Sequence, residues 1–216
     1  LTPDVQSGKG TAQTEITVRN DSYSQIKAYV KAEILDSDGN AVSPVVTSDR
    51  ITIDSNSETS VTLSPKADSF KLWSVGDPNL YTLRVIVSSD DQGTKILDDY
   101  KVKFGYRYIN WDSDTGFSIN GVNTKIKGAC MHNDQGALGA VQEYDAIYRQ
   151  VKILKEYGFN AVRTSHNVSS SVLLDVCDEL GMLVMEEFFD GWSRSKNSNS
   201  KDFSTHFDRA ISSDNK

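Results

Sequence analysis

The feature that most constrains the fold of this chain is a change in the spacing of apolar residues near residue 105. Before that point, short runs alternate apolar and polar residues, which is the pattern of β-strands that bury one face. Turn signals such as Asp38-Gly39 separate these runs. After residue 120 the order becomes strand, helix, strand, helix, strand. These two different patterns of apolar residues predict two domains, residues 1–105 and residues 106–216.

The first domain is predicted to be an antiparallel β-sandwich of immunoglobulin type. Several short strands separated by turns are typical of that architecture. This part of the chain contains no cysteine pair that could link the two sheets. The expected strands are Thr14–Arg19, Ile26–Leu35, Ser60–Leu63, Tyr81–Val87 and Ile96–Phe104.

Two amphipathic helices are predicted in the second domain. Apolar residues recur at helical spacing from Tyr144 to Leu154, and Gly158 suits the left-handed residue that ends a helix. A second helical run, Val172 to Leu180, follows possible N-caps at Ser169 to Ser171 and precedes Gly181. The strands around these helices are expected at Ile126–Met131, Phe159–Thr164 and Met182–Met185.

Three strands joined by two crossover helices require a parallel sheet, either doubly wound or the start of a (β/α)8 barrel. Doubly wound sheets that bind nucleotides carry a glycine-rich first turn with a characteristic spacing. Gly136–Gly139 lacks the Lys or the third Gly of such a loop. We therefore predict the first three βα units of a TIM barrel.

Charge and composition exclude several classes of partner. The net charge of −7 without a Lys/Arg cluster argues against nucleic acid. No apolar run approaches the roughly 20 residues of a membrane segment, and the first residues lack the pattern of a signal peptide. Cys130 and Cys177 are expected to be buried free thiols rather than a disulfide or metal pair. No metal and no cofactor are expected.

Polar side chains follow each of the three strands of the second domain. Because parallel strands end at the same edge of a sheet, these side chains are expected to converge on one rim of the barrel, where function is predicted. The candidate substrate-binding residues are His132, Asp134, Arg163, His166, Asn167, Glu187, Asp190 and Trp192.

Short ordered motifs extend through nearly the whole chain. They are Leu72-Trp73, Asn79–Tyr81, Phe104–Arg107, Gly116–Gly121, Lys127-Gly128, His132–Asp134, Gly136–Gly139, Asn160–Asn167, Leu174–Gly181 and Glu187–Trp192. Together they resemble glycoside hydrolase family 2, in particular its bacterial β-galactosidases. The resemblance implies a retaining enzyme built from a jelly-roll domain, an immunoglobulin-like sandwich and a barrel.

The resemblance also implies that both catalytic carboxylates lie outside this chain. In the family the acid/base is the Glu of an Asn-Glu pair after the fourth barrel strand, and the nucleophile is a Glu near the seventh. No Asn-Glu dipeptide occurs in the sequence. The isolated chain is therefore expected to be inactive, and the rest of the polypeptide or a self-association partner is expected to cover the open barrel.

Glu186 and Glu187 are not expected to replace those carboxylates. A retaining pair lies about 5 to 5.5 Å apart and an inverting pair roughly 6.5 to 9.5 Å apart, both facing one sugar. Neighbours on a strand point to opposite faces. Glu187 is instead expected to orient a neighbour at the rim, and Asp134 and Asp190 are candidates for binding sugar hydroxyls.

Each remaining rim residue has a structural alternative. His132 is interpreted as a hydrogen-bonding group for a substrate hydroxyl, with a buried core histidine as the alternative. Arg163 and His166 can face the same side only if the chain bends between them; the resemblance places both beside the sugar. Asn167 either binds a hydroxyl or caps the next helix, and Trp192 either stacks on a sugar or packs under the barrel mouth.

Three functions remain open from the sequence. The leading hypothesis is a segment of a hydrolase that acts on terminal β-galactosides. The second is a non-catalytic carbohydrate-binding or adhesion module. The third is a family 2 relative that acts on β-glucuronides or β-mannosides.

Overall fold

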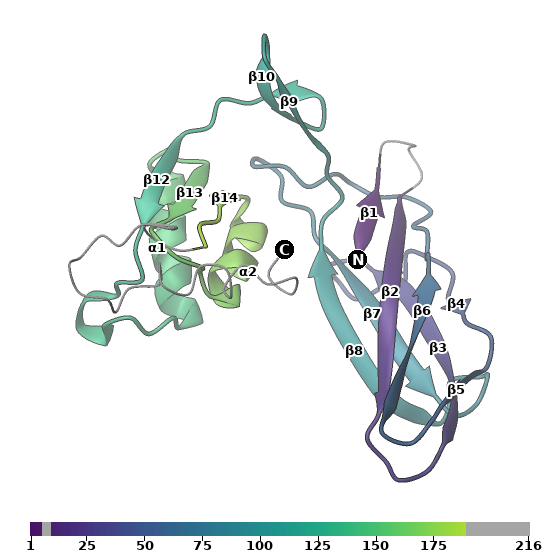
Figure 1. Ribbon diagram of the computed structural model, residues 1–216. Helices are drawn as coiled ribbons and strands as arrows, with labels where there is room; N and C mark the ends of the chain where they lie inside the picture. Colours follow the sequence, from purple (N-terminus) through teal and green to yellow (C-terminus); the bar gives the residue numbers. More distant parts are fainter. Residues whose placement is uncertain (6–9, 189–216) are drawn as a thin grey trace. The chain divides into compact units, whose positions relative to one another are not determined.

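The computed structural model describes residues 1–5 and 10–188. The chain divides into two compact units, residues 1–125 and 126–216, and each is described by itself. The first unit is built from strands, whereas the second combines strands with helices (Figure 1). Asp190 and Trp192 lie outside the described residues.

The first unit is the predicted antiparallel sandwich. One sheet has the strand order β1-β2-β6, and the other has the order β4-β3-β7-β8, with β5 also pairing with β3. The first sheet comprises β1 (Thr2–Asp4), β2 (Thr11–Asn20) and β6 (Ser57–Leu63). The second comprises β3 (Ile26–Leu35), β4 (Val46–Thr47), β5 (Ile51–Ile53), β7 (Tyr81–Ser88) and β8 (Ile96–Phe104).

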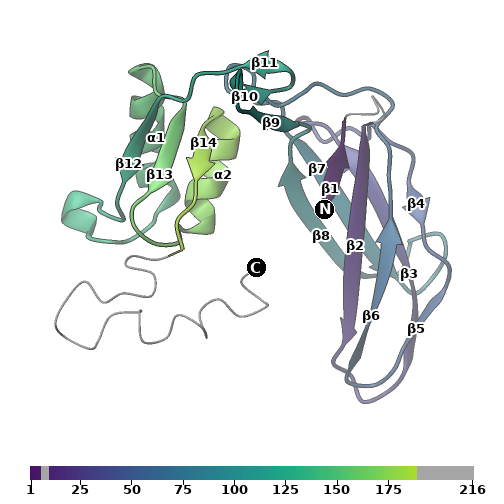
Figure 2. The same ribbon diagram turned by 45° about the horizontal axis from the view of Figure 1, so that its top comes forward.

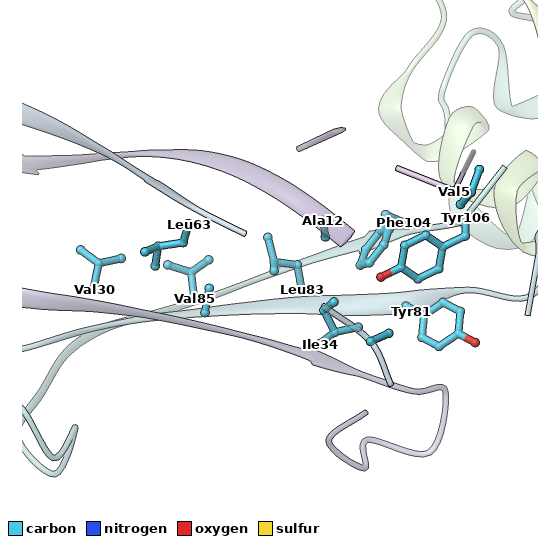
Figure 3. Packing of buried hydrophobic residues seen from close by; sticks show 12 residues of the cluster. Val5, Ala12, Val30, Ile34, Leu63, Tyr81, Leu83, Val85, Phe104 and Tyr106 are labelled. Carbon is cyan, nitrogen blue, oxygen red and sulfur yellow. The ribbon is translucent and has the colours of Figure 1, made fainter. Parts of the chain in front are cut away.

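Alternation along the strands builds the core between these sheets. Val30, Ala32 and Ile34 on β3 are buried, and Leu83 and Val85 on β7 lie beside them (Figure 3). The side chains that alternate with them are more exposed. Burial of this apolar surface, at about 25 cal/mol per Å², is the main force that holds the sandwich together.

A small third sheet belongs to the same unit. It consists of β9 (Ile109–Asp112), β10 (Gly116–Ile119) and β11 (Val122–Asn123). This sheet lies in the compact unit that ends at residue 125. Two hydrogen bonds join residues after 105 to the sandwich: the buried Tyr106 hydroxyl donates to the Gly10 carbonyl at 2.7 Å, and Asn120 Nδ2 donates to the Trp73 carbonyl at 2.9 Å.

The second unit is the predicted βαβαβ arrangement. Its sheet has the order β12-β13-β14, and both pairings are parallel. The elements are β12 (Gly128–Met131), the 3-10 turn η1 (Gly136–Leu138), α1 (Tyr144–Glu156), β13 (Ala161–Thr164), α2 (Ser171–Leu180) and β14 (Leu183–Met185).

Both helices cover the same face of this sheet (Figure 2). Ile147 and Val151 of α1 and Val176 of α2 are fully buried against sheet residues that include Val162. The N-terminus of α2 is capped by the Ser170 hydroxyl, which accepts from the Leu173 N–H at 3.2 Å.

The two cysteines differ from the sequence prediction in one respect. Cys177, on the apolar face of α2, is buried as predicted, but Cys130 is exposed, so its predicted burial is wrong. Cys130 pairs in register with Arg163, on the sheet face opposite the helices. Among the described residues, none of the helices combines the length and the apolar character needed to cross a bilayer.

The side-chain hydrogen bonds of Asn20 are predicted to contribute to the stability of the sandwich. Its Nδ2 lies 2.9, 3.2 and 3.0 Å from the carbonyl oxygens of Ser24, Ile53 and Asp54. Its Oδ1 accepts from the Ser22 N–H and hydroxyl. Asn20→Ala leaves buried carbonyls without this donor, so we expect a loss of about 3 kcal/mol in the free energy of unfolding.

Urea denaturation measures this loss. Thr17→Ala on the same strand is the control, because Thr17 is exposed and its substitution is expected to cost less than about 1 kcal/mol. Equal effects of the two substitutions would contradict the structural role of Asn20.

Candidate functional site

Strand register separates the two faces of the parallel sheet. Cys130, Arg163 and Met185 are paired side by side, so all three lie on the same face. Val162 and Val184, one position away from Arg163 and Met185, pack with the helices on the other face. The face without helices therefore presents a guanidinium and a thiol, and the strand ends add further polar groups.

Glu187 joins two of the predicted site residues. Arg163 Nε donates to Glu187 Oε1 at 2.6 Å, and Arg163 Nη2 lies 2.6 Å from the same oxygen. His166 Nδ1 lies 3.1 Å from Glu187 Oε2. Both oxygens of one carboxylate are thus engaged by neighbours, which is the orienting arrangement that the sequence predicted for Glu187. The bend required between Arg163 and His166 follows the end of β13 at Thr164.

The bond to Glu187 determines which nitrogen of His166 remains available. An ionised carboxylate only accepts hydrogen bonds, so His166 Nδ1 must carry the hydrogen. The Arg163 Nη2 contact with Nδ1, at 3.4 Å, then joins two donors and is not a hydrogen bond. His166 Nε2 is left to bind another group. The His132 ring lies edge-on, with its centroid 5.7 Å from that of His166.

The electrostatics of this cluster favour its charged forms. Burial alone would raise the pKa of Glu187, but the hydrogen bonds from Arg163 and His166 outweigh it and leave that pKa below its usual value. Hydrogen bonds to Cys130 and Glu187 raise the pKa of Arg163. The carboxylate and the guanidinium therefore remain ionised over the neutral pH range.

Glu186 has different partners from Glu187. Its Oε1 accepts from the Ser169 N–H at 2.6 Å, and the Ser169 hydroxyl lies 3.0 Å from both of its oxygens. Glu186 thus holds the chain that precedes α2, while Glu187 holds the cluster at the end of β13. Glu186 and Glu187 thus bind different residues and form no acid/base pair.

The other predicted residues take varied positions. His132 is exposed, which excludes the alternative of a buried core histidine. Asp134 Oδ1 accepts from the Gly136 N–H at 2.9 Å and so stabilises the turn into η1. Asn167 Nδ2 donates to the Val168 carbonyl at 3.1 Å. Because Ser170 caps α2, the alternative that Asn167 caps this helix is wrong.

Cys130 is a site residue that the sequence did not indicate. Arg163 Nη1 lies 3.3 Å from its sulfur. The Ser165 hydroxyl and the Arg163 guanidinium lower the pKa of the Cys130 thiol, whereas burial raises that of Cys177 to about 12. Only the strand register shows that Cys130 and Arg163 are neighbours, so the sequence contained no signal for this contact.

Comparison with known proteins identifies the family. The family described as glycosyl hydrolases family 2 matches residues 1–107, and its TIM barrel domain matches residues 113–210. This chain belongs to glycoside hydrolase family 2. The predicted fold, an immunoglobulin-like sandwich followed by the first part of a TIM barrel, is confirmed.

Curated relatives of this chain carry two kinds of name. A putative β-glucuronidase of Formosa agariphila is 33% identical over 89% of this chain and 17% of its own length. A β-galactosidase of Bacteroides ovatus is 34% identical over 95% of this chain and 23% of its own length. The chain therefore spans about a fifth of these curated relatives.

Solved structures of similar proteins agree with the fold. A member from Bacteroides cellulosilyticus has a TM-score of 0.83 at 33% identity, covering 93% of this chain and 25% of that one. A β-glucuronidase of Bacteroides uniformis has a TM-score of 0.75 at 26% identity, covering 83% and 21%.

The thiol of Cys130 offers a probe of the cluster. Arg163 lowers the pKa of this thiol and Glu187 raises it. Arg163→Met should therefore raise the pKa and slow alkylation at neutral pH, whereas Glu187→Gln should lower it and speed alkylation. One pKa unit changes the thiolate fraction about tenfold well below the pKa, so changes of about threefold to tenfold are expected.

Rates of iodoacetamide labelling between pH 6 and pH 9, followed by intact mass, measure these shifts. Cys130→Ser is the control and should abolish the fast reaction, because the buried Cys177 has a raised pKa. Shifts of the same sign in both variants would contradict the proposed electrostatics.

Proposed function

We propose that this chain is the sandwich and the first part of the barrel of a retaining glycoside hydrolase that acts on terminal β-galactosides. In this proposal the Arg163–Glu187–His166 cluster holds the substrate sugar. The two catalytic carboxylates come from parts of the polypeptide outside this chain. The observation that carries the proposal is the cluster itself, in which one carboxylate orients a guanidinium and an imidazole on the sheet face without helices.

The cluster suits the recognition of hydroxyl groups. Glu187 leaves His166 Nε2 available, and a neutral imidazole nitrogen of this kind accepts a hydrogen bond from a hydroxyl. The His132 ring lies beside the His166 ring and adds a second imidazole to the cluster. Such groups bind and orient a sugar but supply neither an acid/base pair nor a nucleophile, so the isolated chain is expected to bind without hydrolysis.

The charge balance supports a neutral sugar over a uronic acid. A β-glucuronide carries a carboxylate, and binding it requires a cationic side chain that is not already paired with an acidic residue. Arg163 is already paired with Glu187 at 2.6 Å, and Glu186 adds a further carboxylate to the same segment. Within the described residues, the cluster thus favours a neutral sugar over a uronic acid, and among neutral sugars the galactoside is proposed from the name of the Bacteroides ovatus relative.

A β-glucuronide is the second candidate. Its support is that the Formosa agariphila relative and the Bacteroides uniformis structure are both named β-glucuronidase. A cation supplied by a part of the polypeptide outside this chain would make that substrate compatible with the cluster.

The substrate is tested with nitrophenyl glycosides on the full-length protein. We expect hydrolysis of the β-galactoside with retention, seen as β-galactose appearing first in the proton NMR spectrum. The β-glucuronide and the β-mannoside should react at least about 100-fold more slowly, since a site that leaves a polar group unpaired discriminates strongly. Preference for the β-glucuronide would select the second candidate, and binding without any hydrolysis would indicate a carbohydrate-binding module.

The role of the cluster is tested by His166→Ala in the full-length protein. Loss of a hydroxyl contact is expected to lower kcat/KM by about 10- to 100-fold, equivalent to about 1.4 to 2.7 kcal/mol. Glu186→Gln is the matched control, because Glu186 contacts Ser169 and not the cluster, and it should retain near-normal kcat/KM. Equal losses in both variants would count against a role of His166 in sugar binding.

A further inference from the structure

Arg163 lies on β13, the middle strand of the parallel sheet, and contacts residues from both neighbouring strand segments. On one side, Glu187 follows β14, and its backbone N–H donates to the Thr164 hydroxyl at 2.8 Å. On the other side, Cys130 of β12 pairs in register with Arg163, and its sulfur lies 3.3 Å from Arg163 Nη1. The guanidinium therefore links all three strand segments.

The contacts with Glu187 alone do not fix the orientation of the guanidinium. Arg163 Nε donates to Glu187 Oε1 at 2.6 Å, and Nη2 lies 2.6 Å from the same oxygen. Two contacts that converge on one oxygen leave the guanidinium free to rotate about that oxygen. Because the guanidinium is planar and rigid, the contact of its third nitrogen, Nη1, with the Cys130 sulfur removes this freedom.

The donors of Arg163 are only partly used by these contacts. A guanidinium carries five N–H donors, and a cysteine sulfur accepts weakly as a thiol and more strongly as a thiolate. Within the described residues, Glu187 and Cys130 engage one N–H on each of the three nitrogens. One N–H of Nη1 and one N–H of Nη2 remain for another group. Their direction follows from the rotation that the sulfur fixes.

We propose that Cys130 is a positioning residue, which holds the Arg163 guanidinium so that its two remaining N–H groups are directed at the substrate. This inference rests on the proposed function, in which the cluster holds the sugar. Cys130 acts through Arg163 and takes no part in the hydrolysis itself. A donor whose direction is already fixed loses less entropy when a ligand binds, so loss of the sulfur contact weakens recognition without removing the donor.

The alternative is that Cys130 only packs against the stem of Arg163. Met185 offers a comparison, because it pairs in register with Arg163 from the opposite side and lies on the same face of the sheet. Its side chain is large and apolar, and it is 58% exposed. Truncation of Met185 therefore removes packing beside Arg163 while the contact of Nη1 with the Cys130 sulfur is kept.

The test measures kcat/KM of the full-length protein with whichever nitrophenyl glycoside it cleaves. Cys130→Ala is expected to lower kcat/KM by about threefold to tenfold, which is the effect of one hydrogen bond. Cys130→Ser keeps an acceptor at this position and should recover most of the loss. Met185→Ala is the matched control and should change kcat/KM by less than about twofold.

A double-mutant cycle with Arg163→Lys separates positioning from packing. A lysine ammonium can pair with Glu187, but it lacks the planar fork that reaches Glu187 and Cys130 at once. Arg163→Lys alone is expected to lower kcat/KM by at least about tenfold. In that background Cys130→Ala should cost less than about twofold, because two residues that act through one contact are not additive.

The positioning role is overturned if Cys130→Ala has no effect, or if it lowers kcat/KM by the same factor with Arg163 and with Lys at that position. Either result, with Arg163→Lys still harmful, leaves the proposed function standing. If Arg163→Lys itself has no effect, the role of the cluster in sugar binding fails, and the positioning role fails with it. Should the protein bind glycosides without hydrolysis, dissociation constants replace kcat/KM in the same cycle, with the same criteria.

Discussion

The period-two alternation of a β-strand is the constraint on which both units depend. In the sandwich it directs Val30, Ile34 and Leu83 into one core and leaves their neighbours at the surface. In the second unit the same alternation, combined with in-register parallel pairing, places apolar residues under the helices and Arg163 on the opposite face. A single strand register therefore determines both the packing of this unit and the position of its polar cluster.

Glu187 organises that cluster because an ionised carboxylate accepts hydrogen bonds and donates none. It holds the Arg163 guanidinium with one oxygen and the His166 imidazole with the other. These contacts lower its pKa despite the opposing effect of partial burial. The cluster is thereby oriented before any ligand binds, which reduces the entropy that binding would otherwise lose. In the proposed function, this orientation serves sugar recognition and not catalytic proton transfer.

The structure and the family assignment agree on which part of the family 2 fold this chain forms. Family 2 models cover its sandwich and its first barrel strands, and the chain spans about a fifth of two curated relatives. Within the described residues, β12 and β14 each have one paired edge, and most of β2 has an open one. Unpaired strand edges beside apolar surface are energetically unfavourable in isolation.

The sequence by itself determined the elements that have strong local signals. Ile26–Leu35 and Ile96–Phe104 were predicted with their observed bounds, and the helix before Gly181 ends where expected, because alternation and glycine conformation are local properties. Tertiary structure alone decided the exposure of Cys130, the choice of Ser170 as helix cap and the contacts of Glu187 with Arg163 and His166. These features depend on strand register and on where the chain bends after β13. Both are set by residues far apart in the sequence, and no local pattern encodes them.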